Sequence, residues 1–513
     1  MTDWNEGYVT DLGYIYGYYN HLNPLFAKLA FLKAGIAIPA VKTACELGFG
    51  QGISVNIHAA TTGIEWFGTD FNPSQVAFAK EMAEKTTSGA KLYDDSFAEF
   101  LKNSDLPDFD YIGLHGIWSW ISDENRADIV DFIRKKLKVA GILYISYNTM
   151  PGWASFAPIR HLMMQHTEVM GAEGQGIVGL INGAVDFTGR LLATGPKYAR
   201  VNPFVVNSFK KLKQENRNYL AHEYFNKHWK PMHFAEMAEW LEPTKVQFAC
   251  SANYLDQIDG LFLTPEQQAF LNEIPDVMFR QTVRDYMTNR QFRKDYWVKG
   301  ARKLSPIEQL ETLRQQRVIL VADRKDISLK VSGILPEVVM HEELYNPILD
   351  ALADHKPKTI GQLEQEISNT GIAFYQLLQA IMILASNFGQ LMMAQDDAEI
   401  ASSAQRAEKL NDYLINKARG SSDVNYLASP VTGGGIPVGR LHQLFLLALK
   451  HGKTKPAEWA SFVSEIISTQ EQHFLIEVQG PASSEKKLAE MTAEAISFAE
   501  KHLPILQALR IAS

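Results

Sequence analysis

Between residues 42 and 148, short apolar runs alternate with amphipathic stretches, and this alternation leaves few folds open to the chain. The apolar runs predict strands over 42–48, 65–70, 90–94, 109–114 and 142–148, and the stretches between them predict four helices. Strands that alternate with helices form parallel sheets covered on both faces. The expected fold class is therefore α/β, with a doubly wound sheet that binds its ligand at the carboxyl ends of the strands.

Capping residues mark the starts of three of these helices. Asn72 precedes Pro73, which suits a first helical turn, and Ser96 with Glu99 has the spacing of a capping box. A third start is expected at Ser122 or Asp123, and that helix ends in the basic run RKKLK, as the helix dipole favours.

The composition is that of a soluble globular protein, because 46% of the 513 residues are hydrophobic and 21% are charged. A chain of this length is expected to form two to four domains. The net charge of −8 argues against nucleic acid as a partner, since phosphate binding needs a positive surface. Two cysteines, no secretion signal and no apolar run of about 18 residues predict a cytoplasmic protein without membrane insertion.

The stretch TACELGFGQG, residues 43–52, joins the first predicted strand to the first helix. A dinucleotide-binding loop has the spacing G-x-G-x-x-G, whereas Gly48, Gly50 and Gly52 follow G-x-G-x-G. Ile53 stands where the third glycine should be. S-adenosylmethionine (AdoMet) suits this loop better than NAD, because AdoMet has no pyrophosphate for the loop to bind.

Acidic residues near the ends of three strands favour the same ligand. Asp70 can accept hydrogen bonds from both ribose hydroxyls, and an acid after the third strand can accept one from the adenine amino group. A tight strand-to-helix turn without a ligand is the alternative, since acids near helix N-termini are common. The expected cofactor-binding residues are Glu46, Gly48, Gly50, Gly52, Asp70, Phe71, Asp95, Ser96 and His115.

Several segments carry a resemblance to a known family. ACELGFGQG and GTDFNP resemble motifs one and two of the Rossmann-like AdoMet methyltransferases. FDYIGLHGIWSWIS (109–122) and GILYISYNTMPGW (141–153) are similar to motifs of bacterial methyltransferases that carry a methyltransferase regulatory domain. Residues 219–241 and 284–297 resemble that regulatory domain. The group includes the rickettsial protein-lysine methyltransferases.

The resemblance implies a Rossmann-like methyltransferase core with a helical insertion and with C-terminal helical and winged-helix-like regions. The core is expected over 1–153, and 231–260 can complete its sheet. The other expected regions are a helical insertion (154–230), a helical and hairpin regulatory region (261–335), a winged-helix-like domain (336–400) and a C-terminal helical region (401–513). Within them, we expect helical structure over about 260–310, a β-hairpin over 317–333 and a loop over 428–437.

Methyl transfer is an in-line displacement that needs a deprotonated acceptor in a site without water. Residues after the fourth and fifth strands are expected to face the methyl group, which makes His115, Trp118, Tyr147 and Asn148 catalytic candidates. His115 can act as a base or have a structural role, and Trp118 or Trp120 can border the pocket or pack in the core.

The N-terminal segment 7–24 is rich in tyrosine and is expected to fold over the active site. Its rings can hold a sulfonium or a methylammonium by cation–π attraction, or they can pack against the edge of the sheet. Asn23 or His21 can also help to hold the cofactor. The tyrosines are Tyr8, Tyr14, Tyr16, Tyr18 and Tyr19, and Tyr14 is the catalytic candidate among them.

Two other patterns carry no site. HEYFNKH (222–228) lacks the H-E-x-x-H spacing of a metalloprotease helix, so no metal is expected there. The apolar helix predicted within 372–389 contains no Lys or Arg, which favours a protein contact or a homodimer over DNA binding.

The sequence therefore predicts an AdoMet-dependent methyltransferase. The resemblance implies a protein substrate, modified on lysine amines. A small-molecule acceptor is the alternative within the enzyme class, and a non-catalytic AdoMet-binding regulatory module is the alternative outside it.

Overall fold

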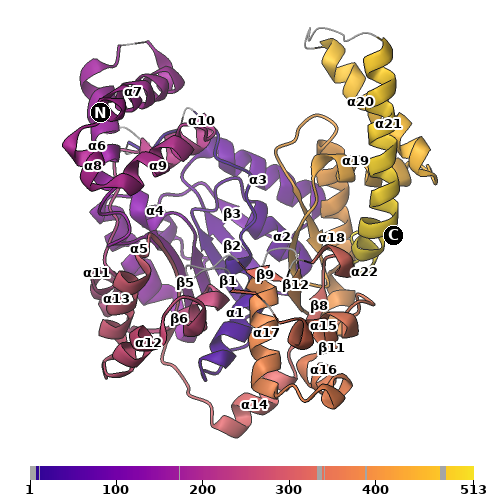
Figure 1. Cartoon of the computed structure of the whole chain (residues 1–513), viewed down its shortest axis with the longest axis horizontal. Coiled ribbons are helices and arrows are strands. Elements are labelled where there is room, and N and C mark those ends of the chain that lie inside the picture. The colour runs from indigo at the N-terminus through magenta and orange to yellow at the C-terminus, as the bar shows by residue number, and fades with distance from the viewer. Residues whose placement is uncertain are drawn as a thin grey trace.

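Seven strands form one central sheet in the part of the chain that the structure describes (Figure 1). This computed structural model describes residues 7–10, 12–172, 174–327, 329–331, 338–339, 341–386, 390–473 and 481–512. The strands are β1 (Thr43–Leu47), β2 (Glu65–Thr69), β3 (Lys91–Tyr93), β4 (Phe109–Leu114), β5 (Leu137–Asn148), β6 (Val246–Ser251) and β7 (Phe292–Lys299). Their order across the sheet is β3-β2-β1-β4-β5-β7-β6.

The first five strands run parallel, and β1 pairs with both β2 and β4. The direction of winding reverses between β1 and β4, and ligands bind in the crevice that such a reversal leaves at the carboxyl ends of strands. The predicted doubly wound α/β core is confirmed.

The helices that connect these strands begin where their capping residues predict. The Asn72 side chain accepts a hydrogen bond from the Ser74 amide, Ser96 and Glu99 form the expected capping box, and Ser122 caps the fourth helix. These caps satisfy backbone amides that a helix start leaves unpaired. The helices are α2 (Ile53–Thr61), α3 (Pro73–Thr86), α4 (Phe97–Lys102) and α5 (Asp123–Lys136).

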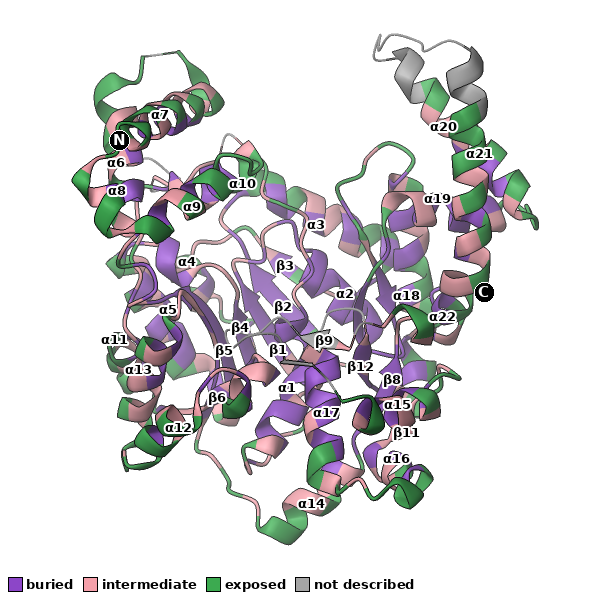
Figure 2. Cartoon of the chain, viewed as in Figure 1, coloured by how far each residue is buried: buried purple, intermediate pink, exposed green. Residues whose placement is uncertain are grey.

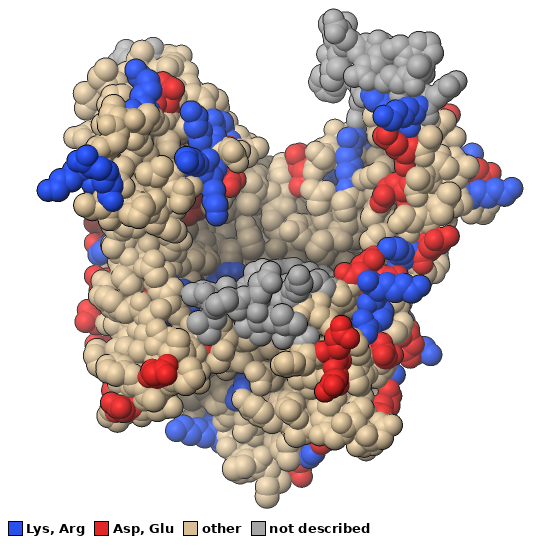
Figure 3. All heavy atoms as spheres, in the orientation of Figure 1, with Lys and Arg blue, Asp and Glu red and all other residues tan. Residues whose placement is uncertain are grey.

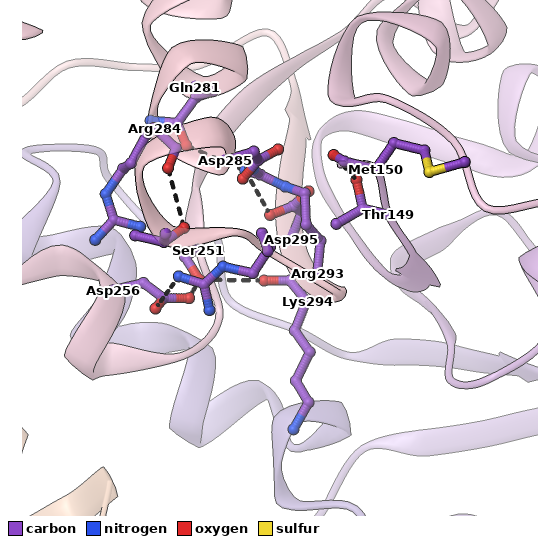
Figure 4. Close-up of polar contacts among 12 residues, drawn as sticks. Thr149, Met150, Ser251, Asp256, Gln281, Arg284, Asp285, Arg293, Lys294 and Asp295 are labelled. Carbon is purple, nitrogen blue, oxygen red and sulfur yellow. Dashed lines mark hydrogen bonds and ion pairs between the residues drawn. The ribbon is translucent and has the colours of Figure 1, made fainter. Parts of the chain in front are cut away.

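Two antiparallel strands extend the sheet beyond β5. β6 lies in the segment expected to complete the sheet, but β7 occupies residues that we expected to be helical, so that prediction was wrong. The helices α12 (Pro265–Asn272) and α13 (Val277–Thr288) end before β7. The charged residues of this segment did not indicate a buried strand. Arg293 is nevertheless buried and pairs with Asp285 and Asp295 at 2.7 and 2.8 Å, while Lys294 extends away from this cluster (Figure 4).

Five helices follow β5 and form an arm with an apolar core of its own, at the left of Figure 1. The arm ends before α11 (Phe234–Leu241). Met163, Ile181 and Phe209 belong to that core. The five helices are α6 (Ala157–Met170), α7 (Gly176–Ala193), α8 (Lys197–Val201), α9 (Pro203–Leu212) and α10 (Arg217–Tyr224). Helices thus fill the segment where the insertion was predicted, and its boundaries as a domain stay a prediction.

A three-stranded sheet follows in the order β11-β8-β12, formed by β8 (Arg317–Leu320), β11 (Lys358–Thr359) and β12 (Leu391–Ala394). The hairpin expected over 317–333 was wrong, because β8 pairs with β11 and β12, while β9 (Lys330–Val331) pairs with β10 (Val338–Val339). Residues 328, 332 and 333 of that prediction lie outside the described residues.

The winged-helix-like assignment of residues 336–400 stays a prediction. The helices of this region are α14 (Pro306–Arg314), α15 (Glu342–Ala351), α16 (Ile360–Glu366) and α17 (Phe374–Ser386), and α14 packs on α1 (Pro24–Lys33).

The C-terminal region packs against the core sheet's own helices. α18 (Asp397–Lys417) contacts α2 and α3, and its inner face is buried (Figure 2). The loop expected over 428–437 is instead a hairpin of β13 (Tyr426–Ser429) and β14 (Gly434–Pro437), because its glycines let the ring of Tyr18 pack on the backbone. The remaining helices are α19 (Arg440–Lys450), α20 (Pro456–His473), α21 (Pro481–Ser497) and α22 (Leu503–Ala508). None of the described helices has the length and apolar character needed to cross a membrane.

Candidate active site

A pocket lies at the carboxyl ends of β1 to β4, where the strand order predicts a ligand. Loops that follow these strands form one wall, and the N-terminal segment forms another. The predicted site residues that line it are Tyr14, Glu46, Gly48, Gly50, Asp70, Phe71, Asp95, Ser96 and His115.

The glycine loop after β1 brings bare backbone to this pocket. Gly48 and Gly50 have φ angles of +70° and +58°, which side-chain-bearing residues rarely adopt, and a Cβ at Gly48 would lie 2.4 Å from the Ile117 side chain. Gly52 also has a positive φ, but it does not line the pocket; a Cβ there would meet Ala79 of α3 at 2.5 Å. Gly52 therefore serves helix packing, and its cofactor role stays a prediction.

Two buried carboxyl groups dominate the electrostatics of the pocket. Asp70 accepts hydrogen bonds from the Gly50 and Asn72 amides at 2.8 and 3.0 Å, and burial nonetheless raises its pKa to about 6. Burial, together with the negative charge of Asp70, raises the pKa of Glu46 to about 8. Glu46 is 3% exposed, and its Oε2 has no hydrogen-bond partner among the described residues.

The charge of the pocket is one-sided. Glu46, Asp70 and Asp95 line it, whereas none of its described lining residues is a lysine or an arginine. Burial and the neighbouring carboxylates Asp94 and Glu99 raise the pKa of Asp95 as well. Such a pocket favours a ligand that carries positive charge.

The tyrosine-rich N-terminal segment folds over the pocket, as expected. The Val9 amide donates to Asn226 Oδ1 at 2.9 Å, and the Lys227 amide donates to the Gly7 carbonyl at 3.0 Å. Tyr8, Tyr14 and Tyr19 line the pocket. The segment is thus fastened to the chain just after α10, and three of its five tyrosines face the site.

The other candidate residues of the N-terminal segment make contacts outside the pocket. Tyr16 packs on Phe78, and the Tyr18 hydroxyl lies 3.1 Å from His58 Nε2. Asn23 Nδ2 donates to the carbonyls of the β13–β14 turn, at residues 432 and 433. His21 is buried among aromatic rings. Neither Asn23 nor His21 lines the pocket.

The whole architecture is shared with a solved methyltransferase. PKMT2 from Rickettsia typhi, whose structure was determined in complex with AdoHcy, matches 97% of this chain and 100% of its own with a TM-score of 0.66. The two sequences are 18% identical. The likeness shows that both chains have the same fold.

Sequence relatives define the family. The description "predicted methyltransferase regulatory domain" fits residues 216–299, from the start of α10 to the end of β7. The uncharacterized protein sll1526 of Synechocystis sp. is 38% identical over 513 residues, which cover 99% of this chain and 99% of that protein. The chain belongs to the bacterial class I methyltransferases with a methyltransferase regulatory domain. A further relative, the uncharacterized protein RP028 of Rickettsia prowazekii, is 34% identical over 29% of this chain and 61% of its own length.

His115 lies on the pocket wall of this methyltransferase as a neutral ring. Its Nδ1 is 2.7 Å from the Tyr144 hydroxyl, and its ring stacks on Tyr19 with 3.8 Å between centroids. Burial, and then the positive charge of Lys294, lower the pKa of His115 to about 3. A ring with this pKa is a weak base near neutral pH.

Three catalytic candidates of the methyltransferase, Trp118, Tyr147 and Asn148, do not line the described pocket, and their catalytic roles stay predictions. Trp118 is fully buried, and its Nε1 donates to the Met232 sulfur at 3.3 Å. The Tyr147 hydroxyl donates to Asp295 Oδ2 at 2.9 Å. Successive strand residues point to opposite faces, so Tyr144 and Ser146 reach His115 while Tyr147 faces away. Trp120, the other tryptophan considered, lines the pocket.

Sequence reasoning missed the contribution of α10 and the residues after it. His228 lines the pocket, and the His222 ring packs on Tyr8 and Tyr14 at 5.5 and 5.1 Å. Both belong to the HEYFNKH motif, which we considered only for metal binding. No local signal places this motif over a glycine loop that lies more than 150 residues earlier in the chain.

Proposed function

We propose that this methyltransferase binds AdoMet in the pocket at the ends of β1 to β4 and transfers its methyl group to lysine amines of a protein. The observation that carries the cofactor assignment is the one-sided charge of the pocket. AdoMet is positive at its sulfonium and its amino group, so the carboxylates of Asp70 and Asp95 attract it, and so does Glu46 once it ionises. The same carboxylates would repel the pyrophosphate of a dinucleotide.

The residues present fit AdoMet in further respects. Gly48 and Gly50 allow close approach to the backbone, and the unpaired Glu46 Oε2 can accept a hydrogen bond from a ligand donor. Asp70 is our candidate for the ribose hydroxyls, and Asp95 or Ser96 for the adenine. We expect the N-terminal segment to exclude water from the bound cofactor.

AdoMet supplies an electrophilic methyl group, so the protein must mainly position the acceptor and keep its amine deprotonated. A lysine amine has an ordinary pKa near ~10.4 and needs a dry environment or a base. Tyr8, Tyr14 and Tyr19 supply an aromatic wall, which attracts a methylated ammonium through cation–π contacts.

A protein acceptor is supported by the resemblance to the rickettsial protein-lysine methyltransferases and by the shape of the molecule. Figure 3 shows a broad hollow between the arm of α6 to α10 and the C-terminal helices. A polypeptide can enter such a hollow, whereas a small acceptor needs an enclosed site.

The test uses AdoMet labelled on its methyl group, incubated with the protein and a cell lysate. Gly50→Asp is the inactive control, because it adds a side chain and a negative charge at a φ of +58° beside Tyr14. We expect label in acid-precipitated protein, on lysine by mass spectrometry. Label found only in small molecules would instead establish a small-molecule acceptor, and tight AdoMet binding without any transfer would support the non-catalytic module.

A further inference from the structure

The tyrosine wall of the pocket has a carboxylate behind it, outside the pocket lining itself. Tyr8, Tyr14 and Tyr19 form this wall, and the Glu223 carboxylate of α10 is close enough to all three to influence the pKa values of their hydroxyls. Glu223 is the acidic residue of the HEYFNKH motif. This motif lacks the spacing of a metal site, and Glu223 has no role in the proposed cofactor site.

Contacts to the pocket lining hold α10 in place. Trp120, which lines the pocket, donates its Nε1–H to the Glu223 carbonyl at 3.2 Å. The preceding residue, His222, packs on Tyr14 and lies 3.0 Å from the Leu12 carbonyl through its Nε2. Glu223 is therefore held where the regulatory domain contacts both the loop after β4 and the N-terminal segment.

Glu223 has no ion-pair partner within the residues that the structure describes. The amide of Asn148, at the end of β5, lies beside its carboxylate, and Asn148 Nδ2 is buried without a hydrogen-bond partner among the described residues. Arg160 is the nearby cation, but its Nη2 donates to the Asn226 carbonyl and its guanidinium lies 4.7 Å above the Trp229 ring. A half-buried carboxylate without a counterion favours a cation that comes from outside.

The titration range of Glu223 suits proton exchange near neutral pH. Burial raises its pKa to about 7, and Asn148 and Arg160 oppose this rise. The titratable groups that face it are Tyr8, Tyr14, Tyr19, Arg160, Tyr219 and Tyr224. Burial raises the pKa of each of these tyrosines and lowers that of Arg160, so Glu223 is the member that changes charge near pH 7.

We infer that Glu223 binds the alkylammonium of the acceptor and takes its proton, with Tyr8, Tyr14 and Tyr19 as the aromatic wall of this acceptor site. The inference rests on the proposed function. The proton moves from the lysine Nζ to a carboxylate oxygen of Glu223. The freed Nζ electron pair then forms the bond to the methyl carbon, and the carbon–sulfur bond breaks with its electron pair left on sulfur.

This assignment separates the acidic groups by role. Glu46 and Asp70 stand beside the glycine loop and belong to the cofactor side. His115, with a pKa near 3, cannot hold a lysine proton at neutral pH. Asn148, a catalytic candidate from the sequence, becomes a positioning residue that acts through Glu223.

The decisive variant is Glu223→Gln, compared with Glu223→Asp and with Glu215→Gln, an exposed glutamate just before α10. Initial rates of labelled methyl transfer to lysate protein are measured at saturating AdoMet from pH 6 to 10. We expect the wild-type rate to rise up to about pH 7 and then to level off. Glu223→Gln should be at least ~100-fold slower at pH 7.5, and its rate should keep rising towards pH 10, because free amine then comes from solution titration alone.

A second measurement does not depend on turnover. Butylammonium chloride, a mimic of the lysine side chain, is added to the AdoHcy complex, and the shift in Tm is recorded. We expect stabilisation in the wild type and in Glu215→Gln, weaker stabilisation in Glu223→Asp, and none in Glu223→Gln. AdoMet affinity within about twofold of wild type shows that Glu223→Gln is folded.

Two outcomes are distinguished. A Glu223→Gln variant with the wild-type rate, the same pH profile and the same butylammonium shift would overturn the assignment of Glu223. Wild-type protein that binds AdoMet but labels no lysine, while butylammonium still stabilises it through Glu223, would overturn the proposed acceptor and leave the ammonium site standing.

Discussion

Glu46 and Asp70 place two carboxyl groups in one buried pocket, and this pair makes cofactor binding depend on pH. Without a ligand, Glu46 with a pKa of about 8 is largely protonated at neutral pH. A positive ligand favours the ionised carboxylate, so binding should release this proton. We expect AdoMet affinity to rise by up to about tenfold per pH unit between pH 6 and 8. Calorimetry in two buffers with different ionisation enthalpies counts the protons released.

Glu46→Gln is the control for this dependence, since it cannot release a proton, and an unchanged proton count in that variant would contradict the assignment to Glu46. Stability without ligand should show the opposite trend. The folded pKa lies above the ordinary value of 4.5, so the folded chain holds a proton that the unfolded chain releases. The contribution of Glu46 to the free energy of unfolding is therefore present below about pH 4.5 and is lost as the pH rises towards 8.

Asp70 is expected to hold the ribose of AdoMet. Asp70→Ala should weaken AdoMet binding by ~1–3 kcal/mol, because it removes hydrogen bonds to a charged group. Titration calorimetry measures the change, with Asp94→Ala as the matched control, since Asp94 is exposed and lies outside the pocket lining. Equal affinities for wild type and Asp70→Ala would show that the ribose lies elsewhere.

Among the elements, the β13–β14 hairpin depends on glycine for its fit to the N-terminal segment. A Cβ at Gly434 would lie 2.2 Å from the Tyr18 hydroxyl oxygen. Gly434→Ala should therefore lower the free energy of unfolding by ~1–3 kcal/mol through overpacking. Denaturant unfolding measures this, with Gly260→Ala as control, where the nearest atom would be 4.0 Å away. A Gly434→Ala variant as stable as the control would show that Tyr18 moves aside at little cost.

The same element-scale view explains what could be predicted from the sequence. The β1 to β5 units follow from apolar periodicity and from local caps at Asn72, Ser96 and Ser122, all of which act within a few residues. β7 did not follow, because its buried Arg293 pairs with Asp285 of α13 as well as with Asp295 of the same strand, and the local pattern does not contain the contact to α13. The hairpin at 426–437 was missed because glycines indicate a loop unless their packing partner is known.

At the scale of the whole molecule, the C-terminal half and the cofactor-binding core share one hydrophobic cluster. Leu410 of α18 belongs to it with Ile57 of α2 and Met82 of α3. Leu410→Ala should cost ~2–5 kcal/mol of stability. AdoMet should then slow limited proteolysis of α18, since a ligand bound to the core stabilises everything that unfolds with it.

Glu408→Ala is the control for this experiment, because Glu408 is exposed on the same helix. Cleavage of α18 in Leu410→Ala at a rate that AdoMet does not alter would show that the two halves unfold independently.

The site itself was predictable only where neighbours in sequence are neighbours in space. Glu46, Gly50 and Asp70 meet because consecutive parallel strands end at one edge of the sheet. His228 reaches the same pocket, and Glu223 comes to lie behind the pocket-lining tyrosines, through the docking of α10, which local periodicity cannot express. Tyr147 turns away from the pocket for a smaller reason, since successive residues of a strand face opposite sides of the sheet. Trp118 is buried in a 3-10 turn that the sequence pattern did not indicate.

The attachment of the N-terminal segment to the residues after α10 has a thermodynamic consequence. The segment covers the pocket, and its amides and carbonyls bind at Asn226 and Lys227 within the regulatory domain. Any molecule that pulls this domain away from the segment and thereby weakens AdoMet binding by some factor must itself bind the AdoMet-loaded protein more weakly by that same factor. The methyl donor and a regulator of this domain are in that sense effectors of each other.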